Sequence, residues 1–129
     1  EGRALLLLEA AGLIKLSADA GLEATPVNIA ENPNGFKFTE VEAATLPRVL
    51  DDVDAAVING NYAIPVGLSA TKDGLFVENA ESPYVNIVSV KDGNQNNPKV
   101  QAVVKALQSD KIKNWVADKY KNGEVVVVF

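Results

Sequence analysis

The stretch from Val53 to Tyr62 constrains the fold of this chain more than any other part of the sequence. It is an apolar run that ends in Asn59-Gly60-Asn61, a pattern typical of a strand buried on both faces. Ligands in open α/β sheets lie at the carboxyl ends of such strands, so Asn59 is a candidate ligand contact. The alternative is that Asn59-Gly60 marks only a turn, because Asn tolerates a left-handed conformation and Gly adopts it freely.

The segments around this stretch indicate an α/β protein. Residues 37–41 alternate apolar and polar side chains and predict a strand, residues 45–52 predict a helix, and residues 54–58 predict the next strand. A strand, a helix and a strand joined by short connections are typical of a parallel βαβ unit.

The rest of the chain gives further helices and strands. Residues 3–11 predict a helix capped by Gly12, and residues 13–35 predict an irregular surface excursion with one short helical turn at 26–30 that Thr25 can cap. The remaining predictions are a helix at 62–68 that closes near Gly67, strands at 75–78 and 84–90, helices that start at Pro98 and after Ser109, and an apolar tail at 125–129.

Composition excludes several classes of function. The chain has 129 residues, a net charge of −5, no cysteine and no histidine. A nucleic-acid partner is disfavoured because no basic stripe exists to bind phosphates. Thiol nucleophiles, imidazole bases and soft metal ligands are absent, and no glycine-rich cofactor motif occurs, so we expect no catalytic residue, metal or cofactor. Binding is therefore favoured over catalysis.

Two further side chains are candidates for contact with a small ligand. Arg3 lies at the start of the first predicted helix, where a guanidinium beside exposed N–H groups suits a carboxylate or phosphate. Asn86 is a polar residue inside the β-branched run 84–90, so its amide either makes a structural hydrogen bond or contacts a ligand. The simpler alternative for Arg3 is a solvated side chain near a terminus.

The acidic residues give a weaker signal. Glu40 and Glu42 share one face of the strand predicted at 37–41, or its end, and are compatible with a carboxylate pair. Acid–base catalysis would require them to converge in a pocket, which their spacing does not demand, and a solvated strand edge explains them as well.

Several blocks of this sequence resemble the methionine-binding lipoproteins of the NlpA/MetQ type. They follow the order of the family across nearly the whole chain, which is more specific than any single motif. The blocks are residues 2–8, 11–16, 31–33, 46–48, 51–59, 72–78 and 82–86.

The resemblance implies a type II periplasmic-binding-protein fold, with two α/β lobes and an amino acid held between them. It further implies that Arg3 pairs with the carboxylate of methionine and that Asn59 and Asn86 hold its amino and carboxylate groups. Tyr62 would line the same wall. Such proteins deliver methionine to the membrane subunits of an ABC importer and are lipid-anchored outside the cytoplasm.

By the same resemblance, this chain is a C-terminal fragment. Residues 1–80 would form most of the second lobe without its leading strand, and residues 81–129 a hinge strand and helices that return toward a first lobe that is largely missing. We therefore expect the isolated chain to bind methionine weakly or not at all, because enclosing a ligand needs both walls. We also expect it to self-associate through exposed C-terminal elements.

Two other interpretations remain open. The first is a non-catalytic surface lobe with a structural or adhesive role that has lost ligand binding. The second is an enzyme of flavodoxin-like architecture, which would need a cofactor or a pair of perturbed acids. Convergence of Arg3, Asn59 and Asn86 on one concave surface would favour a solute-binding protein over both.

Overall fold

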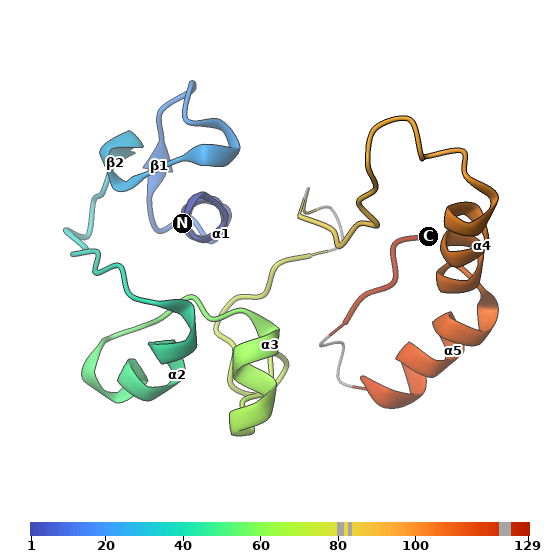
Figure 1. Cartoon of the computed structure of the whole chain (residues 1–129). Coiled ribbons are helices and arrows are strands. Elements are labelled where there is room, and N and C mark those ends of the chain that lie inside the picture. The colour runs from blue at the N-terminus through green and yellow to red at the C-terminus, as the bar shows by residue number, and fades with distance from the viewer. Residues whose placement is uncertain (80–81, 83, 122–124) are drawn as a thin grey trace. The chain divides into compact units, whose positions relative to one another are not determined.

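The computed structural model describes residues 1–79, 82, 84–121 and 125–129 (Figure 1). Contacts divide the chain into two compact units, Glu1–Glu78 and Asn79–Phe129. The lobe boundary predicted between residues 80 and 81 lies outside the described residues and stays a prediction.

The first unit opens with helix α1 (Gly2–Ala10), whose leucines and alanines are strong helix formers. The helix ends in a Schellman motif. Gly12 has a left-handed conformation, at φ 73°, and its N–H donates to the carbonyl of Glu9, while the N–H of Leu13 donates to the carbonyl of Leu8. The predicted cap at Gly12 is confirmed.

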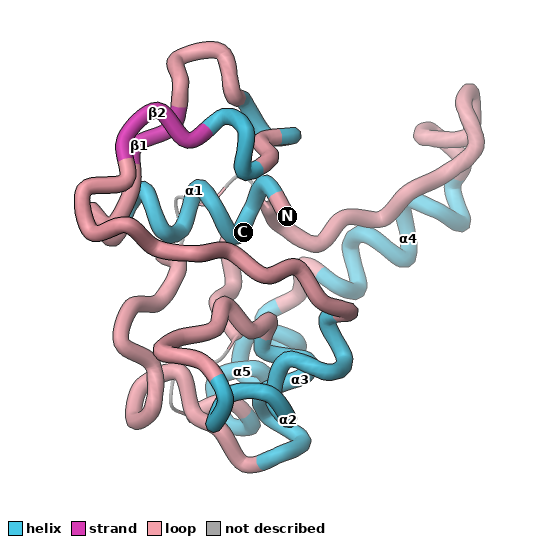
Figure 2. Tube along the Cα trace, turned by 90° about the vertical axis from the view of Figure 1, so that its left-hand side faces the viewer, coloured by secondary structure: helices cyan, strands magenta, loops and turns pink. Residues whose placement is uncertain are grey.

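The segment after α1 forms the core of the first unit, so the prediction of a surface excursion at 13–35 is wrong. Strands β1 (Lys15–Leu16) and β2 (Ile29–Glu31) pair antiparallel beside α1 (Figure 2). The turns between them let the chain fold back over the helix, so a segment without periodicity still encloses apolar side chains. The buried hydrophobic residues of the described chain are Leu5, Ile14, Leu16 and Ala24.

Three helical predictions in the first unit are confirmed, each as a short segment. The turn at 26–30 is the 3₁₀ helix η2 (Pro26–Asn28), in which the Asn28 carboxamide oxygen accepts from the N–H of Thr25 at 2.9 Å. The helix at 45–52 and the helix at 62–68 are each part α and part 3₁₀. Besides η2, the short helical segments of this unit are, in chain order, η1 (Gly21–Glu23), η3 (Ala43–Thr45), α2 (Leu46–Val49), η4 (Leu50–Asp52), α3 (Gly60–Ala63) and η5 (Ile64–Val66).

The predicted strands at 37–41, 54–58, 75–78 and 84–90 are not strands in the described structure. The sheet of the described residues consists of β1 and β2, so the parallel βαβ unit predicted from the sequence is not formed there. A strand exists only where a neighbouring backbone supplies its hydrogen bonds. The apolar patterns show that these segments are compatible with a sheet. They do not specify a neighbouring strand to which each segment could hydrogen-bond.

The second unit contains two helices, α4 (Pro98–Leu107) and α5 (Asp110–Lys119), as predicted. Both begin at a side-chain cap. The Asn97 carboxamide oxygen accepts from the N–H of Lys99 at 2.9 Å, and the Ser109 hydroxyl accepts from the N–H of Ile112 at 3.4 Å.

The apolar faces of α4 and α5 are less buried than their periodicity predicts. Val103 is 51% exposed, Leu107 45% and Trp115 50%, and none of the described residues of the second unit is buried. An apolar stripe is buried only when another element covers it. Within the described ranges, every helix is too short or too polar to cross a membrane.

Candidate ligand-binding site

Asn59 and Tyr62 lie at the start of helix α3. Asn59 has an extended conformation (φ −69°, ψ 143°) and is the N-cap residue, but its side chain makes no capping hydrogen bond. Its carbonyl accepts from the N–H groups of Tyr62, at 2.9 Å, and Ala63, at 3.1 Å. Gly60 is the first residue of α3 and does not adopt a positive φ. The sequence Asn59-Gly60 therefore begins a helix, and the left-handed turn considered as the alternative does not form.

The backbone beneath Arg3 is fixed by tight packing at Gly2. Gly2 is buried, and a Cβ atom placed on it would lie 2.2 Å from the carbonyl oxygen of Leu22. This contact brings α1 directly against the backbone of residues 22–24. Leu5, one turn further along the helix, is only 4% exposed. The first turn of α1, and with it the Cα atom of Arg3, is consequently held against the core of the first unit.

The guanidinium of Arg3 binds the carboxylate of Glu78. Arg3 Nε donates to Oε1 at 3.2 Å and to Oε2 at 2.9 Å, and Arg3 Nη2 also donates to Oε2. This arrangement is a bidentate, charge-assisted pair. The Arg3 side chain is 44% exposed and that of Glu78 27%. Arg3 is therefore not simply solvated, since its side chain is engaged with a carboxylate.

Glu78 is not a functional candidate on the sequence alone. The two residues lie 75 positions apart, so no local pattern connects them. Glu78 ends a segment predicted as a strand, where a terminal acid is typical of an ordinary solvated residue.

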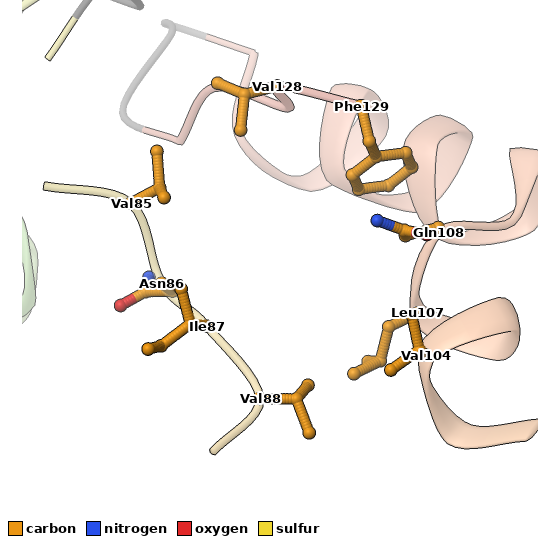
Figure 3. A pocket seen from close by; sticks show the side chains of 9 residues that line it. All are labelled: Val85, Asn86, Ile87, Val88, Val104, Leu107, Gln108, Val128 and Phe129. Atoms are coloured by element: carbon orange, nitrogen blue, oxygen red, sulfur yellow. The ribbon is translucent and has the colours of Figure 1, made fainter. Parts of the chain in front are cut away.

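Asn86 belongs to the second unit, in segment 84–90, which is neither helix nor strand. It is exposed, so its carboxamide is open to solvent and the penalty for burying an unpaired amide does not arise. The segment borders a groove of about 450 Å³. In Figure 3 the side chain of Val88 points toward Val104 and Leu107 on α4, whereas the carboxamide oxygen of Asn86 points away from α4.

The lining of this groove is mostly apolar. Its residues are Val85, Asn86, Ile87, Val88, Val104, Leu107, Gln108, Val128 and Phe129. Arg3, Asn59 and Tyr62 belong to the first unit and Asn86 to the second, and the convergence of these four side chains stays a prediction.

The acidic residues do not form the carboxylate pair that the sequence allowed between Glu40 and Glu42. Glu40 instead hydrogen-bonds to Glu1, and this hydrogen bond, together with lost hydration and repulsion between the two carboxylates, raises the pKa of Glu1 above its ordinary value of 4.5. Glu1 and Glu40 are both exposed. Among the described residues, no group of three or more acidic side chains is placed to hold a metal ion.

A cross-strand ion pair also marks the first unit. Lys15 Nζ lies 2.9 Å from Glu31 Oε1 across the β1–β2 register. A hydrogen bond to Glu31 and attraction to its charge raise the pKa of Lys15. Both side chains are about two-thirds exposed, so the pair is a surface feature of the hairpin.

Comparison with known proteins places these observations in a family. The model of the NlpA lipoprotein family matches residues 1–129. The chain is 51% identical over 125 residues to the membrane lipoprotein TpN32 of Treponema pallidum and 46% identical over 127 residues to the D-methionine-binding lipoprotein MetQ of Escherichia coli. These matches cover 97% of this chain but 47% and 46% of the two relatives, so the chain spans about half their length.

Solved structures match over the same range. A nutrient-binding protein from Burkholderia cenocepacia, bound to methionine, has a TM-score of 0.89 and 48% identity, with 100% of this chain and 54% of that chain covered. The lipoprotein Tp32 from Treponema pallidum has a TM-score of 0.87 and 51% identity, with 96% and 52% covered. These matches confirm the predicted fold class, of which this chain holds a part.

The relatives are named as lipoproteins and binding proteins, and the NlpA lipoprotein family is not a family of enzymes. A family model that spans all 129 residues, together with relatives near 50% identity, shows that this chain belongs to the NlpA lipoprotein family.

Proposed function

We propose that this chain supplies part of the binding site of a methionine-binding lipoprotein. In this proposal Arg3 binds the carboxylate of the amino acid, and Asn59 and Asn86 hold its amino and carboxylate groups. Tyr62 contributes to the wall of the site. The complete protein is anchored by lipid outside the cytoplasm and delivers methionine to the membrane subunits of an ABC importer.

One observation carries the proposal. The methionine-bound protein from Burkholderia cenocepacia matches this chain over its whole length, at 48% identity and a TM-score of 0.89. Identity at this level over the whole of this chain supports the same use of the fold.

The chemistry of Arg3 supports the same assignment. Its guanidinium is engaged in a bidentate contact with a carboxylate, the group that every free amino acid carries. The Asn59 side chain is not consumed by capping α3. A carboxamide offers both a donor and an acceptor, which suits the oppositely charged ends of a zwitterion.

We expect the isolated chain to have little or no affinity for methionine. Small-ligand sites bury most of the ligand surface, and this chain spans about half the length of its relatives. Isothermal titration of the monomeric chain with methionine should show no saturable heat below the millimolar range. A micromolar or tighter dissociation constant would contradict this expectation.

A chimera tests the assignment itself. In the chimera this chain replaces the matching part of the Burkholderia cenocepacia protein, so that the remaining part of that protein completes the site. We expect the chimera to bind methionine. Arg3→Ala should weaken binding about 10- to 100-fold, because hydrogen bonds to charged groups contribute roughly 1.5–3 kcal/mol. Asn59→Ala and Asn86→Ala should each weaken it about tenfold.

The chain provides matched controls for these variants. Arg48 is an exposed arginine in α2, and Asn61 is an exposed asparagine two residues after Asn59. Arg48→Ala and Asn61→Ala should leave the dissociation constant within about twofold. If the chimera has the circular dichroism of the parent but binds no methionine, the result would instead support the alternative interpretation, a non-catalytic surface lobe without ligand binding.

A further inference from the structure

The contact between Arg3 and Glu78 involves one particular edge of the guanidinium. Glu78 occupies the side edge of the guanidinium, formed by Nε and Nη2. A guanidinium carries five N–H donors and has a second bidentate edge, formed by its two terminal nitrogens. One carboxylate can therefore fix the orientation of the group while a different edge receives another.

Arg3 is held at both ends of its side chain. At the base, the close approach of Gly2 to the carbonyl of Leu22 and the burial of Leu5 fix the helix. At the tip, Glu78 binds the guanidinium through two of its nitrogens. The arginine side chain has several rotatable bonds between its Cα atom and its guanidinium. Fixing both ends greatly restricts the rotamers that the side chain can adopt.

The exposure of the pair argues against a role in stability alone. With the Arg3 side chain 44% exposed and Glu78 27% exposed, solvent screens the attraction, and such pairs contribute little to folding. The geometry of the pair instead favours ligand binding, because a binding group that is already oriented loses less entropy when its ligand binds.

We propose that Glu78 is a positioning residue for Arg3, which holds the guanidinium in the orientation that receives the ligand carboxylate. The inference rests on the proposed function in naming an amino acid as the ligand. Its geometric part, that Glu78 orders the Arg3 side chain, stands on the structure of the first unit.

The first experiment uses the 129-residue chain itself and needs no ligand. The Nε–H resonance of Arg3, assigned by its loss in Arg3→Lys, is followed in ¹⁵N-labelled protein. In Glu78→Gln we expect hydrogen exchange at Nε to accelerate about tenfold and the heteronuclear NOE at this site to fall, because a charge-assisted bond is lost. Glu42→Gln, at an exposed acid in the same unit, should change neither quantity.

The second experiment uses the chimera and two ligands. Glu78→Gln should weaken binding of methionine about tenfold but leave binding of methioninol, which lacks the carboxylate, within about twofold. In the Arg3→Ala background, Glu78→Gln should have no further effect on methionine. A residue with a merely structural role would weaken both ligands alike.

The outcomes separate the two proposals. If the chimera binds methionine and Arg3→Ala weakens it, but Glu78→Gln does not, the positioning role is wrong and the function stands. Tighter methionine binding in Glu78→Gln would also overturn it, because Glu78 would then compete with the ligand. If the chimera binds no methionine, the proposed function fails, and the exchange of Arg3 Nε decides whether Glu78 orders the side chain.

Discussion

Gly2 shows how the absence of a side chain fixes the position of a neighbouring functional residue. The backbone of α1 approaches the carbonyl of Leu22 so closely that a Cβ atom at Gly2 would lie 2.2 Å from it. Because the obstructing atom belongs to the backbone, it cannot move away by changing rotamer. The contact therefore requires glycine, although the residue lies in a helix where glycine is otherwise unfavourable.

We expect Gly2→Ala to destabilise the chain by about 1–3 kcal/mol, because the added methyl group forces α1 away from residues 22–24. Urea denaturation followed by circular dichroism measures this change. The matched control is Ala10→Ser at the exposed end of the same helix, which should cost about 0.5 kcal/mol or less. Equal stability of Gly2→Ala and the parent chain would show that α1 is not docked as described.

The protonation of Glu1 depends on its neighbour Glu40. The hydrogen bond to Glu40 raises its pKa above 4.5, so the folded chain holds this proton more tightly than the unfolded chain does. The resulting stabilisation is fully present below the unfolded pKa and is lost as pH rises through the folded pKa. Replacing Glu40 by Gln removes the proton-sharing partner, and the pKa of Glu1 should fall.

Carbon-13 NMR titration of the Glu1 side-chain carboxyl measures this pKa directly. Glu42→Gln is the control and should leave the value unchanged, since no shift of Glu1 is attributed to Glu42. A Glu1 carboxyl that titrates at or below its ordinary value in the unmodified chain would be inconsistent with the contact.

At the scale of elements, the helices of the second unit depend on their ends. None of the described residues in that unit is buried, so packing contributes less to α4 and α5 than it does to α1. Local capping is correspondingly more important. The cap of α4 is the better formed, since Asn97 accepts at 2.9 Å and Pro98 sits at the first turn.

We expect Asn97→Ala to destabilise α4 by about 1 kcal/mol and to reduce the helical circular dichroism signal. Ser109→Ala should have a smaller effect through the longer 3.4 Å bond to Ile112. Ser89→Ala, in the segment before α4, is the control and should leave the signal unchanged. A larger loss in Ser109→Ala than in Asn97→Ala would reverse the order that the cap geometry supports.

The described chain as a whole exposes much apolar surface. Large hydrophobic residues are exposed in both units, including Leu75 at 92%, Ile87 at 77% and Val103 at 51%. Exposed apolar surface of this extent favours association, since burying it removes it from water.

We therefore expect the isolated chain to self-associate as its concentration rises, with the average mass measured by light scattering. Val103→Gln should shift the association to about fivefold higher concentration, because roughly 1 kcal/mol of apolar burial is lost for a half-exposed valine. Ala102→Gln, at the adjacent exposed position of α4, is the control. A strictly monomeric mass at all concentrations would contradict the expectation.

Features that depend on neighbouring residues can be predicted from the sequence. The left-handed cap at Gly12, the turn at Thr25, the closing of the helix at Gly67 and the caps at Asn97 and Ser109 agree with the predictions from the sequence. Each involves hydrogen bonds between groups a few positions apart, and these follow from the local residue types.

Which surfaces are covered and which distant groups meet depends on how the chain folds. The tertiary structure places the core in the irregular segment after α1, leaves the predicted parallel strands unpaired and brings Glu78 to Arg3 across 75 positions. Strand pairing and burial each need a partner supplied by another part of the chain, and no residue pattern within a segment specifies where that partner lies.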